Sequence, residues 1–289
     1  MDYRTLSNEE LEQHFNPRVA ATNVDEKIAA MGTRSTDVRA VYTYTANLSY
    51  GDAPGETLDV FHSGKHGGDA PVQLFIHGGY WRAMDKSNYS FVAPPFVDRG
   101  GVVVVINYDL APSVTLDEIV EQCARSVVWT HRNITRFGGD PSRIYLSGNS
   151  AGGHLVGMLI ARDWANDGLP TDVIKGAAPV TGVMDCRPVL KISVNEDVRL
   201  DAAMAERQSP VDHPPHQTDL PLIVAVGGAE PAGWVELSRA YVRACEQAGL
   251  KPRYMEMPGM DHFDMSAAFG DADSPLTQAI LRQMGLLEG

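Results

Sequence analysis

Cysteine is scarce in this chain of 289 residues. Its three cysteines, Cys123, Cys186 and Cys245, are odd in number and far apart in the sequence. This argues against a disulfide framework and against a zinc knuckle, because both need closely patterned pairs of cysteines. The nine histidines form no H-E-x-x-H pair and no cluster with cysteine, so no metal site is predicted. No motif implies a cofactor.

Basic residues are also in the minority. Lys and Arg total 24 against 37 Asp and Glu, which gives a net charge of −13, and no window gathers basic side chains with aromatic ones. Nucleic acid and anionic membrane surfaces are therefore not expected as partners. A strongly acidic protein does not favour polyanionic substrates either.

Long apolar runs are absent as well. No run approaches the roughly 18 residues that a membrane-spanning helix needs, and the first residues lack the basic-then-apolar pattern of a signal peptide. We therefore expect a cytoplasmic protein. The length suits one large α/β domain with a sizeable core.

The apolar pattern divides the chain into an N-terminal arm, residues 1–37, and a single domain, residues 38–289. The arm is polar and moderately helical. Ser7 and Glu10 have the spacing of a helix start, and Pro17 marks its stop.

Two kinds of strand pattern follow the arm. Alternation of apolar and polar residues over 38–50 and 57–62 predicts two antiparallel strands that open the sheet. Continuous apolar runs then predict parallel strands covered on both faces, at residues 72–76, 101–108, 144–147, 176–180, 220–226 and 253–257. Helical stretches are predicted between and after them, at residues 115–137, 234–248 and 275–284. This alternation predicts a doubly wound, mostly parallel α/β sheet with helices on both faces.

A glycine-rich motif, G-N-S-A-G-G at residues 148–153, joins a predicted strand to a helix-like apolar run. Ser150 has Gly148 two positions before it and Gly152 two positions after it. Such small neighbours allow the crowded backbone of a nucleophile elbow, in which the turn lifts the serine hydroxyl above the sheet. The N–H of Ala151, the first of the new helix, would then point at a developing oxyanion. Taken alone the motif is weak, since a flexible turn also explains it.

A second motif, H-G-G-Y-W at residues 77–81, begins where a predicted strand ends. Ligands of open parallel sheets bind outside the carboxyl ends of the strands. The paired glycines let bare backbone N–H groups converge on a small anion, so Gly79 and Tyr80, and alternatively Gly78, are expected to face Ala151 across an oxyanion hole. The alternative is a tight turn with a buried aromatic pair.

Two later strands end in loops that carry an acid and then a histidine. Glu230 follows one predicted strand and His262 follows the next, so the chain order is serine, acid, histidine. We expect His262 to take the serine proton and Glu230 to hold its imidazole. The competing acids are Asp185, Asp261 and Asp264. Asp261 adjoins the base too closely to orient it, Asp264 is expected to cap the following helix, and Asp185 is expected to order a lid.

Five motifs together carry a family resemblance: H-G-G-Y-W at residues 77–81, N-Y-D-L-A-P at 107–112, F-G-G-D-P at 137–141, G-N-S-A-G-G-H at 148–154 and D-H-F-D at 261–264. In this combination the chain resembles the α/β-hydrolase superfamily, and within it the kynurenine formamidase (arylformamidase) branch near the hormone-sensitive-lipase-like esterases. Lipase-like esterases usually carry a third glycine where Tyr80-Trp81 stand here. The arm, with H-F-N-P-R at residues 14–18, is also similar to that branch, in which it covers the active site.

The resemblance implies an α/β-hydrolase fold with a small lid, nucleophile Ser150, base His262 and acid Glu230. Asn149 stands where the branch commonly has His, and Glu230 where it commonly has Asp. The implied activity is that of a serine hydrolase that cleaves a small ester or formamide through an acyl-enzyme intermediate. The alternatives are a carboxylesterase without formamidase activity and a non-catalytic ligand-binding protein on the same fold.

The surroundings of the site yield weaker expectations. Tyr80 and Trp81 are expected to wall an aromatic slot bordered by Asn149, which favours a small neutral or aromatic substrate. Residues 1–37 and 183–215 are expected to form a lid over the site. A homodimer is a further hypothesis.

Overall fold

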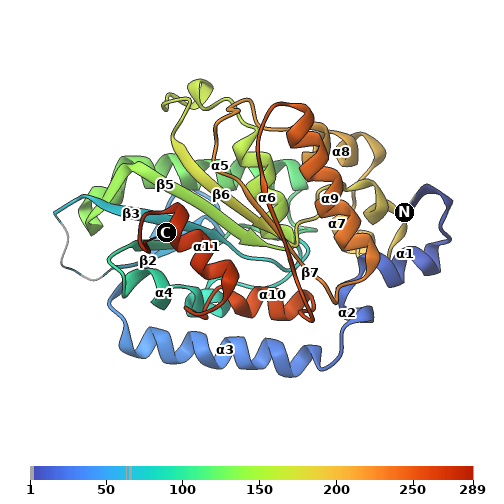
Figure 1. Ribbon diagram of the computed structural model, residues 1–289, viewed down its shortest axis with the longest axis horizontal. Helices are drawn as coiled ribbons and strands as arrows, with labels where there is room; N and C mark the ends of the chain where they lie inside the picture. The colour runs from blue at the N-terminus through green and yellow to red at the C-terminus, as the bar shows by residue number, and fades with distance from the viewer. Residues whose placement is uncertain (1–2, 63, 65–66, 289) are drawn as a thin grey trace.

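A computed structural model describes residues 3–62, 64 and 67–288 of the chain. Its centre is an eight-stranded sheet with the order β1-β2-β4-β3-β5-β6-β7-β8 (Figure 1). The strands are β1 (Tyr44–Ser49), β2 (Thr57–Phe61), β3 (Ala70–Ile76), β4 (Val102–Ile106), β5 (Gly139–Asn149), β6 (Ile174–Val180), β7 (Ile223–Gly227) and β8 (Arg253–Met257). Strand β2 pairs antiparallel with β1 and β4, and the other strand pairs are parallel. The prediction of a mostly parallel sheet opened by two antiparallel strands is confirmed.

The inner strands β3 and β4 are buried along their whole length. Their side chains alternate between two hydrophobic cores, because successive residues of a strand point to opposite faces. Leu74 and Ile76 pack into one core, and Phe75 packs into the other. Burial on both faces explains why these strands are continuous apolar runs in the sequence.

Helices cover both faces of the sheet (Figure 1). The helices α5 (Leu116–Asn133), α6 (Ala151–Ile160) and α9 (Ala232–Gln247) pack on one face. The opposite face carries α3 (Val24–Val41), α4 (Pro94–Val97), α10 (His262–Ala268) and α11 (Pro275–Gln283). Helix α5 begins after Thr115, whose hydroxyl accepts the N–H of Glu118. The doubly wound arrangement is therefore confirmed.

The start of the predicted edge strand is wrong. Residues 38–41 form the last turn of α3, and β1 begins at Tyr44. Ile28, Met31, Ser35 and Val38 recur at helical spacing and turn toward the core, and no proline interrupts the run, so the helix continues to Val41. Helix α3 thus crosses the arm boundary that the sequence predicts at residue 37.

The arm precedes the sheet as short helices, η1 (Tyr3–Thr5), α1 (Asn8–Phe15) and α2 (Pro17–Ala20), followed by α3. Ser7 accepts the N–H of Glu10, and the Glu10 carboxylate accepts the N–H of Ser7. This capping box and the end of α1 at Phe15 confirm the predicted helix start and stop. A second group of short helices, η5 (Arg187–Lys191), α7 (Asn195–Val198), α8 (Ala202–Arg207) and η6 (Pro210–Asp212), follows β6.

All three cysteines are free thiols and are buried. Burial raises the pKa of Cys245 to about 11 and raises the pKa of Cys123 and Cys186 further. Within the described residues, no group of three His, Cys, Asp or Glu side chains could hold a metal ion. No helix in the part of the chain that the structure describes is long and apolar enough to span a membrane.

Candidate active site

Ser150 lies between β5 and α6 with φ of 57° and ψ of −121°, a positive-φ conformation that residues with side chains rarely adopt. The turn needs neighbours without side chains. A Cβ on Gly152 would lie 2.0 Å from the carbonyl oxygen of Ile76, and a Cβ on Gly148 would lie 2.6 Å from that of Gly152. Both glycines therefore allow backbone segments to approach closely, and the resulting turn presents Ser150 to a pocket.

The loop after β3 is also held in a rare conformation. Gly79, Tyr80 and Trp81 have φ values of 116°, 51° and 59°. A Cβ on Gly79 would lie 2.1 Å from the carbonyl oxygen of Ala83. Among the described residues, the backbone N–H groups of Gly79, Tyr80 and Ala151 have no acceptor. They are therefore available to a ligand of the pocket.

His77 fixes the beginning of this loop. Its ring is buried and stacks on Tyr108 with a centroid separation of 4.3 Å. Ring nitrogen Nδ1 lies 2.7 Å from the carbonyl oxygen of Gly78, and Nε2 lies 3.1 Å from Oδ1 of Asn107. His77 does not line the pocket, so it supports the loop from the core side.

His262 and Glu230 form a buried pair at the ends of β8 and β7. Nδ1 of His262 lies 2.6 Å from Oε2 of Glu230. The other carboxylate oxygen, Oε1, accepts the N–H of Gly227 at 2.8 Å, which holds the side chain in place. The ring of Trp234 covers His262 with a centroid separation of 4.4 Å. Because Nδ1 is engaged, Nε2 is the nitrogen left for the pocket that His262 lines.

The competing acids have other partners. Asp185 accepts hydrogen bonds from Tyr3 and Arg187. Asp261 caps α10 and pairs with Lys27 at 2.6 Å, and Asp264 pairs with the same lysine at 2.7 Å. The Asp261 carboxylate accepts two N–H groups of the first turn of α10, and the Asp264 carboxylate accepts the N–H of Asp261. Asp264 thus takes part in the cap expected of it, as the second member of a capping box.

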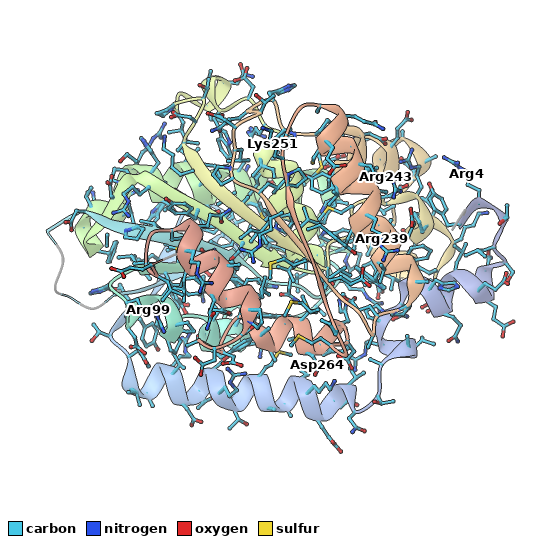
Figure 2. All side chains as sticks on the ribbon, in the orientation of Figure 1. Arg4, Arg99, Arg239, Arg243, Lys251 and Asp264 are labelled. Carbon is cyan, nitrogen blue, oxygen red and sulfur yellow. The ribbon has the colours of Figure 1, made fainter. Side chains whose placement is uncertain are left out.

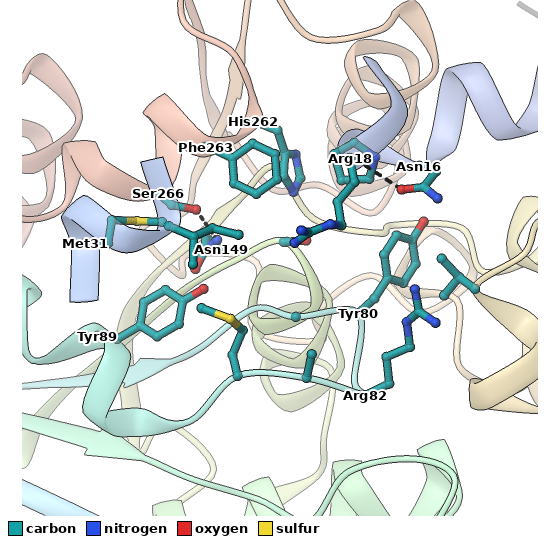
Figure 3. Close-up of a pocket in the computed structure, with 17 residues that line it drawn as sticks. Asn16, Arg18, Met31, Tyr80, Arg82, Tyr89, Asn149, His262, Phe263 and Ser266 are labelled. Atoms are coloured by element: carbon teal, nitrogen blue, oxygen red, sulfur yellow. Dashed lines mark hydrogen bonds between the residues drawn. The ribbon is translucent and has the colours of Figure 1, made fainter. Parts of the chain in front are cut away.

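A pocket of about 110 Å³ lies over Ser150 (Figure 3). It is lined by Asn16, Pro17, Arg18, Ile28 and Met31 of the arm, by Gly79, Tyr80, Arg82, Ala83, Met84 and Tyr89 of the segment after β3, and by Asn149, Ser150, Val194, His262, Phe263 and Ser266. Its wall therefore combines strand ends with the N-terminal helices.

Asn149 and Tyr89 form the polar end of this pocket. The Asn149 amide donates to Oγ of Ser266, and Oδ1 of Asn149 has no partner among the described residues. Burial raises the pKa of Tyr89 to about 12. Gly79 lines the pocket, and Gly78 does not.

Trp81 does not wall the pocket, contrary to the prediction. It is fully buried, and its indole N–H donates to Nδ1 of His154 at 3.2 Å. His154 in turn donates from Nε2 to the carbonyl oxygen of Gln208 at 2.7 Å. Burial lowers the pKa of His154 to about 4, so the ring stays neutral and Nδ1 accepts. This chain of bonds turns Trp81 into the core, and Tyr80 lines the pocket instead.

The sequence analysis identified neither Arg18, Tyr89 nor Phe263 as a pocket residue. Phe263 adjoins His262, so its position could have been found from the motif. Arg18 belongs to the H-F-N-P-R motif. The family resemblance of this motif implies that the arm covers the active site, but it does not identify the side chains that enter the pocket. Tyr89 lies in η2 (Lys86–Val92) and has no local signal.

Comparisons with known proteins agree with this geometry. The α/β-hydrolase fold family matches residues 73–265. A kynurenine formamidase from Salmo salar is 33% identical over 294 residues, covering 98% of each chain. An esterase from Mycobacterium tuberculosis is 29% identical over 245 residues, covering 77% of this chain and 58% of the esterase.

The fold comparison gives the same result. The crystal structure of a candidate thioesterase from Silicibacter sp. TM1040 has a TM-score of 0.79 and 28% identity, covering 92% of this chain and 97% of that one. The family resemblance drawn from the motifs is confirmed. The sheet order, the serine turn after β5 and this similarity over the full length show that the chain belongs to the α/β-hydrolase family and is a hydrolase.

Proposed function

We propose that the pocket hydrolyses small aryl esters or aryl formamides, with Ser150 as nucleophile, His262 as general base and Glu230 as the acid that orients it. The observation that carries the proposal is the 2.6 Å bond between His262 and Glu230 beside the pocket that Ser150 lines. The names of similar proteins, kynurenine formamidase and esterase, support both substrate classes. The aromatic rings of Tyr89 and Phe263 in the lining support an aryl group.

The proposed reaction has two halves. Oγ of Ser150 attacks the carbonyl carbon while Nε2 of His262 takes its proton, and the oxyanion receives N–H groups from Gly79, Tyr80 and Ala151. The tetrahedral intermediate expels the alcohol or amine, which takes the proton from the imidazolium. Water then attacks the acyl-enzyme with the imidazole as base, and release of the acid restores the serine. The paired carboxylate stabilises the imidazolium in both halves.

The arm and residues 183–215 are proposed to act as the lid. Arm residues and Val194 line the pocket, and the hydroxyl of Tyr80 donates to the carbonyl oxygen of Phe15 at 2.7 Å. A cytoplasmic location and a homodimer stay predictions, which fractionation and analytical ultracentrifugation would test.

A carboxylesterase without formamidase activity is the second candidate. Asn149, beside the nucleophile, carries an amide where the formamidase branch commonly has an imidazole, and its side chain lies in the pocket. Ranking aryl formamides against short-chain aryl esters by kcat/KM would separate the two.

A serine-directed organophosphonate tests the shared mechanism. We expect one label per chain, on Ser150, with complete loss of turnover. Ser150→Ala is the matched control, which should neither label nor hydrolyse. Labelling at another serine, or full turnover by Ser150→Ala, would overturn the proposed nucleophile, and absence of both labelling and hydrolysis would favour a binding protein.

A further inference from the structure

Trp234 contacts the proposed general base His262 from outside the set of residues that line the pocket over Ser150. The ring centroids of Trp234 and His262 are 4.4 Å apart, and the two ring planes differ by 52°. The Trp234 side chain is fully buried, and His262 is 4% exposed. The contact therefore lies inside the molecule, where little water reaches either ring.

One short stretch of chain supplies two neighbours of the His262 imidazole. Glu230 and Trp234 stand four positions apart, where β7 gives way to α9. The Glu230 carboxylate lies 2.6 Å from Nδ1 of His262, and the backbone N–H of Trp234 donates to the carbonyl oxygen of Pro231 at 3.0 Å. The turn that carries the acid thus also holds the indole ring against the base.

Helix α9 brings this ring, and no charge, to the interior. The two basic residues of α9, Arg239 and Arg243, project from its outer face and are 49% and 54% exposed (Figure 2). The buried residues of the helix, Trp234 among them, are uncharged. The indole N–H of Trp234 has no hydrogen-bond partner among the described residues. Packing therefore holds the ring, and a substitute for it breaks none of the side-chain hydrogen bonds that the structure shows.

The proposed reaction places a positive charge on the His262 ring in both of its halves. Burial makes such a charge costly, because water cannot solvate it. The Glu230 carboxylate offsets part of that cost at Nδ1, but it does not cover the faces of the ring. The face of an indole carries the negative part of the ring quadrupole and attracts a cation within about 6 Å of the centroid. The separation of 4.4 Å lies inside that range.

We propose that Trp234 stabilises the His262 imidazolium by a cation–π contact, as a positioning residue that acts through the base. The inference rests on the proposed function, since it needs His262 to take the proton of Ser150. The contact is stronger after the proton transfer than before it, so it stabilises the transition state relative to the bound substrate. Trp234 therefore acts on kcat and leaves KM nearly unchanged.

Fluorinated tryptophans inserted at position 234 alone test the charge on the ring face. One, two and three fluorines withdraw increasing negative charge from the face, while the ring keeps nearly the same size. With phenyl acetate or formanilide, whichever reacts faster, kcat should fall about twofold to threefold for each fluorine, and KM should stay within about twofold. Trp234→Leu removes the ring and should lower kcat about thirtyfold. Trp234→Phe should lie between Trp234→Leu and the wild type.

The same fluorinated residues at Trp164 are the matched control. Trp164 is also buried, its indole N–H also lacks a partner among the described residues, and its ring lies beside Arg162 instead of His262. These variants should keep the wild-type kcat. Phosphonate labelling of Ser150, carried to completion, gives the fraction of active sites in each preparation, so a misfolded fraction is not mistaken for slow turnover.

The outcomes separate this inference from the proposed hydrolysis. A ring that only excludes water becomes more apolar with each fluorine, so an unchanged kcat across the Trp234 series would overturn the cation–π contact while hydrolysis stands. An equal fall in the Trp164 series, or a rise in KM at constant kcat, would overturn it as well. Full turnover by Ser150→Ala or by His262→Gln would instead overturn the proposed function, and the inference with it.

Discussion

The pocket has a floor and a roof that are built in different ways. The floor comprises Ser150, the loop at residues 77–81 and the pair of Glu230 and His262, which follow the carboxyl ends of parallel strands. The roof comprises residues 3–41, which reach the pocket from outside the sheet. Backbone crowding and buried hydrogen bonds fix the floor, so its geometry is set by the core.

The roof is joined to the domain by polar links at several points, and many of these links are partly exposed. The Tyr80 hydroxyl bonds the carbonyl oxygen of Phe15, and Lys27 pairs with Asp261 and Asp264. Lys27 and Asp264 are 30% and 36% exposed, so water and salt weaken this pairing. Under the proposed function, the chemistry lies in the floor, whose links are buried, and the roof supplies part of the pocket wall.

The largest effect on activity should come from removing the charge of Glu230 in the floor. Glu230→Gln keeps the size of the side chain but removes the charge that orients and stabilises the imidazolium, so kcat should fall by roughly ten-thousand-fold. Asp185→Asn, which alters an acid bonded to Tyr3 and Arg187, is the control and should cost less than about tenfold. If Asp185→Asn lost most of its kcat while Glu230→Gln stayed active, the acid of the triad would be Asp185, after β6, and not Glu230.

Acid should destabilise the floor through His154. The pKa of His154 in the folded protein is about 4, below the ordinary value of 6.5. Between these two pH values, His154 is therefore protonated in the unfolded chain and neutral in the folded one. The stability is present above pH 6.5 and is lost as the pH falls toward 4. The free energy of unfolding should drop by about 2 kcal/mol between pH 7 and 5.

Urea unfolding at the two pH values checks this expectation. His154→Gln should be less stable at pH 7 but should show a smaller pH dependence, by close to one proton. An identical pH dependence in the wild type and the variant would show that another group accounts for the loss.

Removing the hydrogen bond between the roof and the floor should have a moderate effect on activity. Tyr80→Phe removes the hydrogen bond to Phe15, worth about 1 kcal/mol, so kcat/KM should fall roughly fivefold and proteases should cut the arm faster. Tyr42→Phe removes a comparable hydroxyl, bonded to Asp98, and is the control. Unchanged proteolysis and kinetics in Tyr80→Phe would mean that the arm docks without this bond.

The smallest effect should come from Lys27. Lys27→Met removes both ion pairs to α10 and should lower kcat/KM by less than about threefold at low salt, with no difference from the wild type at high salt. Lys175→Met, which breaks the exposed pair with Asp172, controls for the lost charge. A tenfold or larger loss that persists in salt would show that the lysine positions His262 rather than merely holding the arm.

The floor could be predicted from the sequence because its signals are local. Glycines flank Ser150 at fixed spacing, and Glu230 and His262 each follow an apolar run that reads as a strand. Trp81 could not be placed, because its direction depends on His154, which is 73 positions away in the chain. Arg18 likewise reaches the pocket through the packing of the arm.

The start of the first strand was predicted wrongly for an identifiable physical reason. Residues 38–41 were expected in a strand, although Met31, Ser35 and Val38 continue the helical spacing of α3 into them. Alternation of apolar and polar residues over so short a segment does not distinguish the last turn of a helix from the start of a strand.

The burial of Cys123, Cys186 and Cys245 makes the chain suitable for site-directed spectroscopy. Buried thiols with raised pKa values react slowly with maleimides, so native protein should stay unlabelled without any cysteine being replaced. One cysteine introduced at Val19, which is 45% exposed on α2, would then carry the sole fluorophore. Its emission would show whether the arm opens during turnover, in a protein that keeps all its natural cysteines.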